Sequence, residues 1–217
     1  MSEMRMAEAM RPADIEAESF AIIGRELGPH DYDPQTELVV KRVIHASADF
    51  DYAKTLHFSA RALAQGVEAL RGGATIVTDT TMVAAGINKR VVSRFGGEVR
   101  TFIAEPDVAE EARRRGVTRS AVSMERAARL AGQVVFAIGN APTALMRIAE
   151  MVEDETMEPP ALIVGVPVGF VNVVESKEQI MRLPVEHIVA RGRKGGSTIA
   201  AAIVNALLYI ASDNDRG

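Results

Sequence analysis

The sequence predicts an α/β protein whose mostly parallel sheet is covered by helices on both faces. Short apolar runs alternate with longer helical patterns along all 217 residues, and the connections between them are short. Several of the runs are apolar at every position, as strands buried on both faces are. Strands that alternate with helices in this way form a doubly wound, three-layer sandwich.

Six segments have the length and the β-branched content of strands, and turn-forming residues bound them. The first of these segments contains the stretch KRVIHAS and therefore His45. Taken alone, a histidine in such an apolar setting is more often a packed core residue than a functional one. The predicted strands are residues 38–47, 74–79, 99–104, 134–140, 161–167 and 187–192.

Seven segments between the strands carry helix signals. Pro12 and Pro142 suit a first helical turn, Asp79 and Thr80 supply a cap, and two glycines precede the last helix. That last helix is apolar but shorter than the ~20 residues that cross a bilayer, so we expect it in the core. The predicted helices are residues 12–27, 80–94, 107–115, 123–131, 142–153, 175–182 and 197–211.

Composition favours one domain over residues 1–217, with flexible tails at 1–10 and 212–217. The net charge of −4, the aromatic content of 5% and the lack of tryptophan argue against a nucleic-acid partner. No cysteine is present, and the first residues lack the apolar segment of a secretory signal. We therefore expect a cytoplasmic protein that does not associate with a membrane.

Two loops that follow predicted strands are suited to anions. In GNAPTAL, residues 139–145, Asn140 and Pro142 open a helix, and free backbone N–H groups there favour a negative charge. In RGRKGGST, residues 191–198, Arg191 and Lys194 add cations to a glycine-rich backbone. Neither loop has the spacing of a nucleotide fingerprint. Glycines that only form tight turns are an equally good interpretation of either loop.

Other polar residues are less informative. Three adjacent arginines at 113–115 cannot share one helix face and are expected to be solvated, whereas Arg119 follows a helix-ending glycine and is the better candidate for gripping a carboxylate. His187 opens a strand and is expected to be structural. The aspartates near His30 and His57 match no metal-ligand spacing, so no metal site is predicted.

Five stretches in order, SFAIIGREL, KRVIHAS, GNAPTAL, GVPVGFVNVVESKE and ARGRKGGST, resemble the precorrin-8X methylmutase family of cobalamin biosynthesis. The resemblance covers about residues 12 to 210. It implies a flavodoxin-like fold and a homodimer that holds its carboxylate-rich corrinoid substrate near the subunit interface. It also implies an isomerase that needs no cofactor. Such an enzyme moves a methyl group within ring C of precorrin-8X or cobalt-precorrin-8, giving hydrogenobyrinic or cobyrinic acid.

The resemblance also assigns roles to residues. His45 matches the family's acid–base histidine within R-x-x-H, and Arg42 matches the substrate-binding arginine of that motif. Ser19 and Arg119 match substrate-contacting positions, and at Asn88 some members have threonine. Together with Asn140, Arg191 and Lys194 from the two loops, these residues form the predicted set of substrate contacts.

Two alternatives and one geometric conflict remain. The chain could serve as a corrinoid carrier, or it could be an unrelated nucleotide-dependent α/β enzyme, against which the missing phosphate fingerprints count. In an unbroken strand, Arg42 and His45 would point to opposite faces. If both contact substrate, the predicted strand must end, bend or bulge between them.

Overall fold

The structure is a computed structural model that describes residues 11–213. The expected flexible tail at 1–10 lies outside these residues, as do residues 214–217 of the tail expected at 212–217. Of the C-terminal tail, residues 212 and 213 are described, and they are anchored: Arg71 Nη2 lies 2.8 Å from Asp213 Oδ1, and the Ser212 N–H donates to Leu208 O.

A six-stranded sheet runs through the molecule in the order β1-β6-β5-β4-β2-β3. All neighbouring strands are parallel except β1, which pairs antiparallel with β6 at one edge. This confirms the predicted mostly parallel sheet. The strands are β1 (Leu56–Phe58), β2 (Thr75–Thr78), β3 (Glu98–Arg100), β4 (Val134–Ile138), β5 (Leu162–Gly165) and β6 (His187–Ala190).

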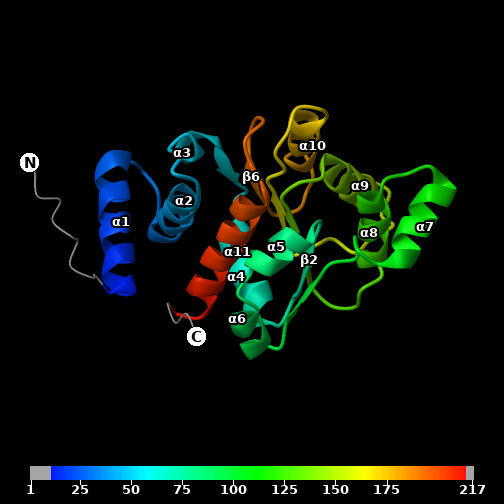
Figure 1. Ribbon diagram of the computed structural model, residues 1–217, viewed down its shortest axis with the longest axis horizontal. Coiled ribbons are helices and arrows are strands. Elements are labelled where there is room, and N and C mark those ends of the chain that lie inside the picture. Colours follow the sequence, from blue (N-terminus) through cyan, green and yellow to red (C-terminus); the bar gives the residue numbers. More distant parts are fainter. Residues whose placement is uncertain (1–10, 214–217) are drawn as a thin grey trace, which may run out of the picture.

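Helices cover both faces of the sheet, as predicted (Figure 1). Alternate strand residues point into two separate cores: Val135 and Ala137 of β4 into one, Phe136 and Ile138 into the other. The first face carries α4 (Ala62–Arg71), α5 (Thr81–Gly86), α6 (Lys89–Arg94) and α11 (Ser197–Ala211). The second face carries α7 (Pro106–Arg115), α8 (Arg119–Ala127), α9 (Pro142–Glu153) and α10 (Val173–Ile180).

Two further helices, α1 (Pro12–Leu27) and α2 (Pro34–Ser47), lie outside α11, and the short α3 (Tyr52–Thr55) follows them (Figure 1). Because α2 packs on the outer side of α11, the latter is covered from both sides. This explains why α11 is apolar around most of its circumference. Among residues 11–213, no helix combines the length and the apolar character that crossing a bilayer requires.

The predicted strand at 38–47 is wrong, because these residues form most of α2. Asp33 caps this helix by accepting hydrogen bonds from the N–H groups of Gln35 and Thr36, and Pro34 occupies the first turn. The buried residues of α2 are Val39, Val40, Val43 and Ile44. Their spacing follows a helix, and the β-branched content hid that period.

Two further predictions need correction at the level of elements. The predicted helix 80–94 is divided into α5 and α6, because Asn88 caps the second helix by accepting from the Val91 N–H. The segment between residues 52 and 71, for which no element was predicted, forms α3, β1 and α4. The other predicted strands and helices are present, with ends that shift by a few residues.

Candidate functional site

The loops at the carboxyl ends of the parallel strands are joined to one another by hydrogen bonds. Thr80, after β2, lies with its Oγ1 3.3 Å from Ser197 Oγ at the start of α11. The Gly196 N–H donates to Val166 O, after β5, at 2.8 Å. This edge of a doubly wound sheet is where such folds bind ligands, and the strand order changes direction between β2 and β4.

At that switch point lies a buried carboxylate, Asp79, which is 1% exposed. It accepts hydrogen bonds from the N–H groups of Gly139, Asn140 and Ala141 at 3.0, 2.7 and 2.7 Å. Burial raises the pKa of Asp79, and the three hydrogen bonds oppose that rise. The N–H groups predicted to be free for an external anion are therefore occupied by the chain's own carboxylate.

Two glycines let these loops come into close contact. A Cβ on Gly139 would lie 2.7 Å from the Ser197 Cα, and a Cβ on Gly195, where φ is +158°, would lie 2.1 Å from Val166 O. Real Cβ atoms do not approach other atoms this closely, so both positions require glycine. The glycine-rich motifs thus serve tight packing between loops.

The β6–α11 loop, residues 191–196, carries three cationic side chains that have different environments. Lys194 Nζ lies 2.6 Å from the carboxylates of both Asp49 and Asp51, which follow α2. Arg191 has a long ion pair of 3.8 Å with Glu178, and the Arg193 guanidinium stands 5.5 Å above the ring of Phe170. The loop is therefore tied to the end of the helix that carries His45.

His45 and Arg42 both belong to α2, so the conflict between them disappears. Residues three apart on a helix are neighbours on its surface, and no bulge is needed. His45 is exposed in the last turn, with its ring 5.4 Å from that of Phe20 on α1. The Arg42 guanidinium is half-buried between the rings of Phe20 and Tyr209, at 4.8 and 5.1 Å.

Arg42 also pairs with Glu16 of α1 through its Nη1. Burial lowers the pKa of Arg42, although a guanidinium keeps its charge in proteins. Arg42, Glu16 and Phe20 together fix α1 against α2. Arg42 therefore fixes the position of the helix that bears His45, and its role as a substrate contact stays a prediction.

An open groove of about 370 Å³ is lined by Ala46, the residue that follows His45 on α2. The side chain of Asn205 connects α11 to the segment between α5 and α6. Its Nδ2 donates to Gly86 O, and its Oδ1 accepts from the Asn88 N–H. A Cβ on Gly86 would lie 2.8 Å from the Ala201 Cβ, so small residues bring α5 close to α11. The lining residues are Ala46, Met82, Gly86, Ser197, Thr198, Ala201, Ala202 and Asn205.

The remaining predicted contacts fall on different elements. Ser19 on α1 donates to Ile15 O one turn earlier, and Asn88 caps α6. Asn140 is exposed just before α9. Arg119 opens α8, on the other face of the sheet from α2, so the predicted set does not form one contiguous cluster around His45.

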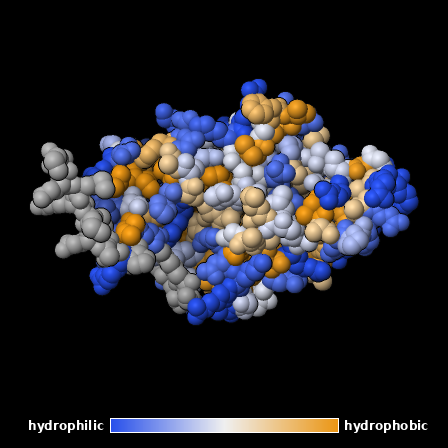
Figure 2. All heavy atoms as spheres, in the orientation of Figure 1, coloured by the Kyte–Doolittle hydropathy of each residue, from blue (hydrophilic) through white to orange (hydrophobic). Residues whose placement is uncertain are grey.

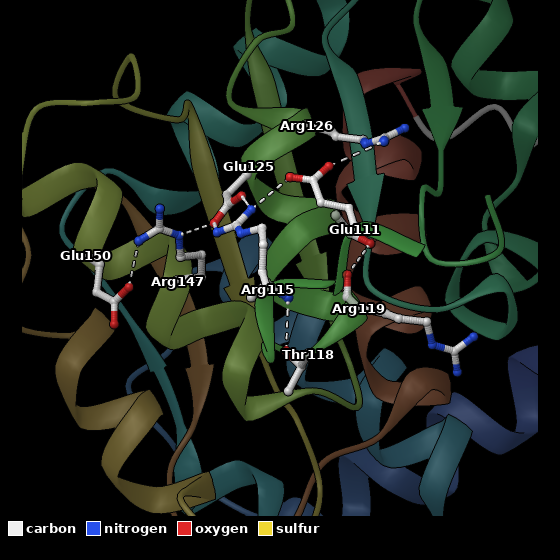
Figure 3. A network of polar contacts seen from close by, with 10 residues as sticks. Glu111, Arg115, Thr118, Arg119, Glu125, Arg126, Arg147 and Glu150 are labelled. Carbon is white, nitrogen blue, oxygen red and sulfur yellow. Dashed lines mark hydrogen bonds and ion pairs between the residues drawn. The ribbon is translucent and has the colours of Figure 1, made fainter. Parts of the chain in front are cut away.

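Arg119 stands apart from the ion pairs around it. Figure 3 shows the network of Arg115, Glu125, Arg147 and Glu150, with the Arg119 side chain pointing away from it. No ion pair to the Arg119 guanidinium is formed by any residue between 11 and 213. The neighbouring Thr118 hydroxyl donates to Thr143 at the start of α9, which places Arg119 near the sheet's carboxyl edge. The predicted role of Arg119 in binding a carboxylate stays a prediction.

His187 is structural, as predicted. It opens β6, is 4% exposed, and its Nδ1 lies 2.9 Å from Val185 O. Its ring stacks on that of His57 at 5.5 Å. Burial, followed by the charges of Arg191 and His187, lowers the pKa of His57. Within the described part of the chain, no three histidine, aspartate or glutamate residues are grouped closely enough to hold a metal ion.

Sequence reasoning missed three polar residues that organise the site: Asp79, Lys177 and Asn205. In the sequence Asp79 is a helix-capping signal, and its place at the end of an apolar strand is the signal of its burial. Lys177 is fully buried and Asn205 lies within an apolar helix. A single polar residue inside an apolar helix is the signal that would have identified Asn205.

Fold and site together define a doubly wound α/β protein with polar and cationic loops at the carboxyl edge of its sheet and a histidine on an outer helix layer beside them. The sequence model of the precorrin-8X methylmutase family matches residues 14–210. The chain belongs to this family, and it is an isomerase of cobalamin biosynthesis.

The sequence similarity to individual relatives extends over nearly the whole chain. Cobalt-precorrin-8 methylmutase of Salmonella typhimurium is 48% identical over 206 residues, which cover 92% of this chain and 95% of the relative. Precorrin-8X methylmutase of Pseudomonas aeruginosa is 43% identical over 196 residues, covering 89% and 93%. The crystal structure of precorrin-8X methylmutase from Thermus thermophilus is similar with a TM-score of 0.84 and 40% identity, covering 92% of this chain and 98% of that one.

Proposed function

We propose that this chain moves a methyl group between neighbouring carbons of ring C in precorrin-8X or cobalt-precorrin-8, giving hydrogenobyrinic or cobyrinic acid. One carbon–methyl bond breaks while another forms on the adjacent carbon, so no atom is gained or lost. Relatives named for both substrates have similar identity, 48% and 43%. Both pigments therefore belong in the test. We place the reaction in the cytoplasm, in a homodimer that holds substrate near its interface.

His45 is the proposed acid and base. It lends a proton to a ring nitrogen, which favours migration, and takes the proton back afterwards. The observation that carries this role is its position: His45 is an exposed imidazole in the last turn of α2, and the residue after it, Ala46, lines a groove of about 370 Å³. An imidazole can both donate and accept a proton, which an acid–base role requires.

The proposed contacts to the substrate carboxylates are Ser19, Arg42, Asn88, Arg119, Asn140, Arg191 and Lys194. Three of these side chains are accessible to a ligand or only weakly paired within the chain, which supports this role. Arg119 and Asn140 are exposed, and the Arg191 side chain has, among residues 11–213, only a long ion pair with Glu178. Each charge-assisted hydrogen bond contributes about 1.5–3 kcal/mol by mutation, so a few such contacts suffice to hold a substrate with many carboxylates.

Replacing His45 tests the proposal. In His45→Gln and His45→Ala, we expect turnover of precorrin-8X to fall by about 10²- to 10⁴-fold, because that is the usual contribution of one acid–base group. Absorption spectra follow conversion of the metal-free and the cobalt-loaded substrate side by side. Binding of the product pigment is expected to change little.

The matched control is His30→Gln, which alters a histidine that precedes α2, at the opposite end of this helix from His45, and that faces Glu37 at 3.6 Å. It should retain wild-type turnover. Full activity in both His45 variants would remove this residue from the mechanism. Wild-type protein that binds the pigment without changing it would indicate a carrier.

A further inference from the structure

Lys177 on α10 is a charged residue that the proposed acid–base step does not use. It is 0% exposed, whereas lysine is almost never fully buried unless it is paired. No carboxylate in the described part of the chain pairs with it. Its Nζ instead donates to two backbone carbonyls, those of Gly192 and Lys194, both at 2.8 Å.

Burial makes this ammonium costly to keep charged. It lowers the pKa of Lys177 to about 8, and no neighbouring charge contributes to the shift. The two carbonyl oxygens replace part of the lost hydration. A leucine or methionine would fill the same space without that cost, so the contact to the β6–α11 loop is the feature that distinguishes a lysine here.

The loop that Lys177 contacts is held from inside the protein at several successive points. The carbonyls of Gly192 and Lys194 face Lys177, and the carbonyl between them, on Arg193, accepts from the Gly169 N–H at 3.2 Å. In a regular strand, successive carbonyls point in alternate directions, so three consecutive carbonyls on the inner side need an irregular backbone. Gly192 provides it with a φ of +78°, a conformation that glycine adopts readily. The side chains of this segment are consequently directed outward, and all three cations are exposed.

The same loop reaches the helix of the acid–base histidine. Lys194, whose carbonyl is held by Lys177, contacts Asp49 and Asp51 with its own ammonium group. Asp49 follows His45 by four residues. One chain of contacts therefore runs from Lys177 through the loop to the carboxyl end of α2.

We propose that Lys177 is a positioning residue for substrate binding, which fixes the backbone of residues 191–196 so that Arg191 and Arg193 face outward while Lys194 ties the loop to the carboxyl end of α2. Lys177 does not itself touch the substrate. The inference rests on the proposed function, because a corrinoid with several carboxylates is the ligand these cations would bind.

The test replaces Lys177 with methionine, which has a similar length and no donor. The control is Ile180→Val, a fully buried residue on the same helix that faces the core on the second side of the sheet. In Lys177→Met we expect the KM for precorrin-8X and the Kd for hydrogenobyrinic acid to rise about tenfold or more, while kcat falls much less, because misplaced contacts weaken binding of the whole substrate. Ile180→Val should leave KM and Kd unchanged.

Amide hydrogen exchange tests the positioning of the loop without any substrate or product. Amide protons of residues 191–196 should exchange faster in Lys177→Met than in the wild type, whereas in Ile180→Val the loop should exchange at the wild-type rate. If Lys177→Met does not fold, Lys177→Gln, which keeps a shorter donor, is measured in its place with the same expectation.

The outcomes separate this inference from the proposed function. Wild-type KM, Kd and loop exchange in the Lys177 variants would overturn the positioning role. An equal loss of binding in Ile180→Val would show general destabilisation and would overturn it too. A wild-type protein that neither binds nor converts either pigment overturns the proposed function itself. The exchange arm would then still decide whether Lys177 anchors the loop.

Discussion

At the scale of single residues, two buried charges, Asp79 and Lys177, organise the carboxyl edge of the sheet. Within residues 11–213, neither pairs with an opposite charge: backbone N–H groups donate to the carboxylate, and backbone carbonyls accept from the ammonium. Each residue holds one loop, Asp79 the loop after β4 and Lys177 the loop after β6. Because a backbone group left without its partner in a buried place is costly, each contact is sensitive to substitution.

The Asp79→Asn substitution keeps the size of the side chain but replaces one acceptor oxygen by a donor NH₂ group. At least one of the three N–H groups at 139–141 then loses its acceptor, so we expect the free energy of unfolding to fall by about 1–3 kcal/mol. Urea denaturation measures this difference. Asp31→Asn, an exposed aspartate, is the control and should change stability by less than about 0.5 kcal/mol. Equal midpoints for both variants would contradict a role for Asp79 in stability.

At the scale of elements, α2 is the helix on which the proposed chemistry depends. Its amino end is fixed by Asp33, which accepts from two backbone N–H groups and from the Thr36 hydroxyl. Its middle packs against α11, and its carboxyl end is tied to the β6–α11 loop through Asp49 and Lys194. An exposed histidine in the last turn thus stands on a helix that is held at both ends.

Removing the cap tests this description of α2. In Asp33→Ala we expect a loss of about 1 kcal/mol of stability at neutral pH, the usual contribution of an N-cap. The hydrogen bond from Thr36 and those from the backbone lower the pKa of Asp33 below its ordinary value of 3.8. The stabilisation is therefore present above that value and is lost as pH falls through the lower folded-state pKa.

Thermal unfolding of Asp33→Ala and the wild type, measured from pH 7 down to about 2, follows this difference. The gap in Tm should be constant near neutral pH and should close only under acidic conditions, below the ordinary range of an aspartate pKa. A gap that is the same at every pH would show that the carboxylate charge does not contribute to the cap.

At the scale of the whole molecule, the predicted contacts lie on both faces of the sheet: Ser19, Arg42 and His45 on the layer of α1 and α2, and Arg119 on the layer of α8. Figure 2 shows apolar side chains gathered near α10, on the segment following β5 where Val168, Phe170 and Val171 are exposed. One chain therefore presents a dispersed set of polar contacts together with exposed apolar residues. This arrangement is compatible with a site near a subunit interface, as the proposed homodimer requires.

Light scattering measures the assembly directly. We expect a particle of twice the chain mass of 23.3 kDa. If the site lies near the interface, turnover per chain should also fall when the protein is diluted below the concentration at which it dissociates, because monomers then accumulate. A monomeric mass with full turnover at every dilution would contradict the homodimer.

The sequence by itself determined the alternation of strands and helices, and with it the mostly parallel sheet, because buried strands and capped helices carry local signals. The order of five short motifs determined the family. The sequence did not determine the structure of residues 38–47, because a β-branched run suits a strand as well as a helix. The helix is selected by burial of its apolar side chains against α11, which lies more than 150 residues away in the chain. These side chains are Val39, Val40, Val43 and Ile44. Tertiary structure also decided which charge occupies the N–H groups at 139–141 and what holds the loop at 191–196. Asp79 and Lys177 are distant in sequence from the groups they bind, and local propensity contains no information about contacts that only the folded chain creates.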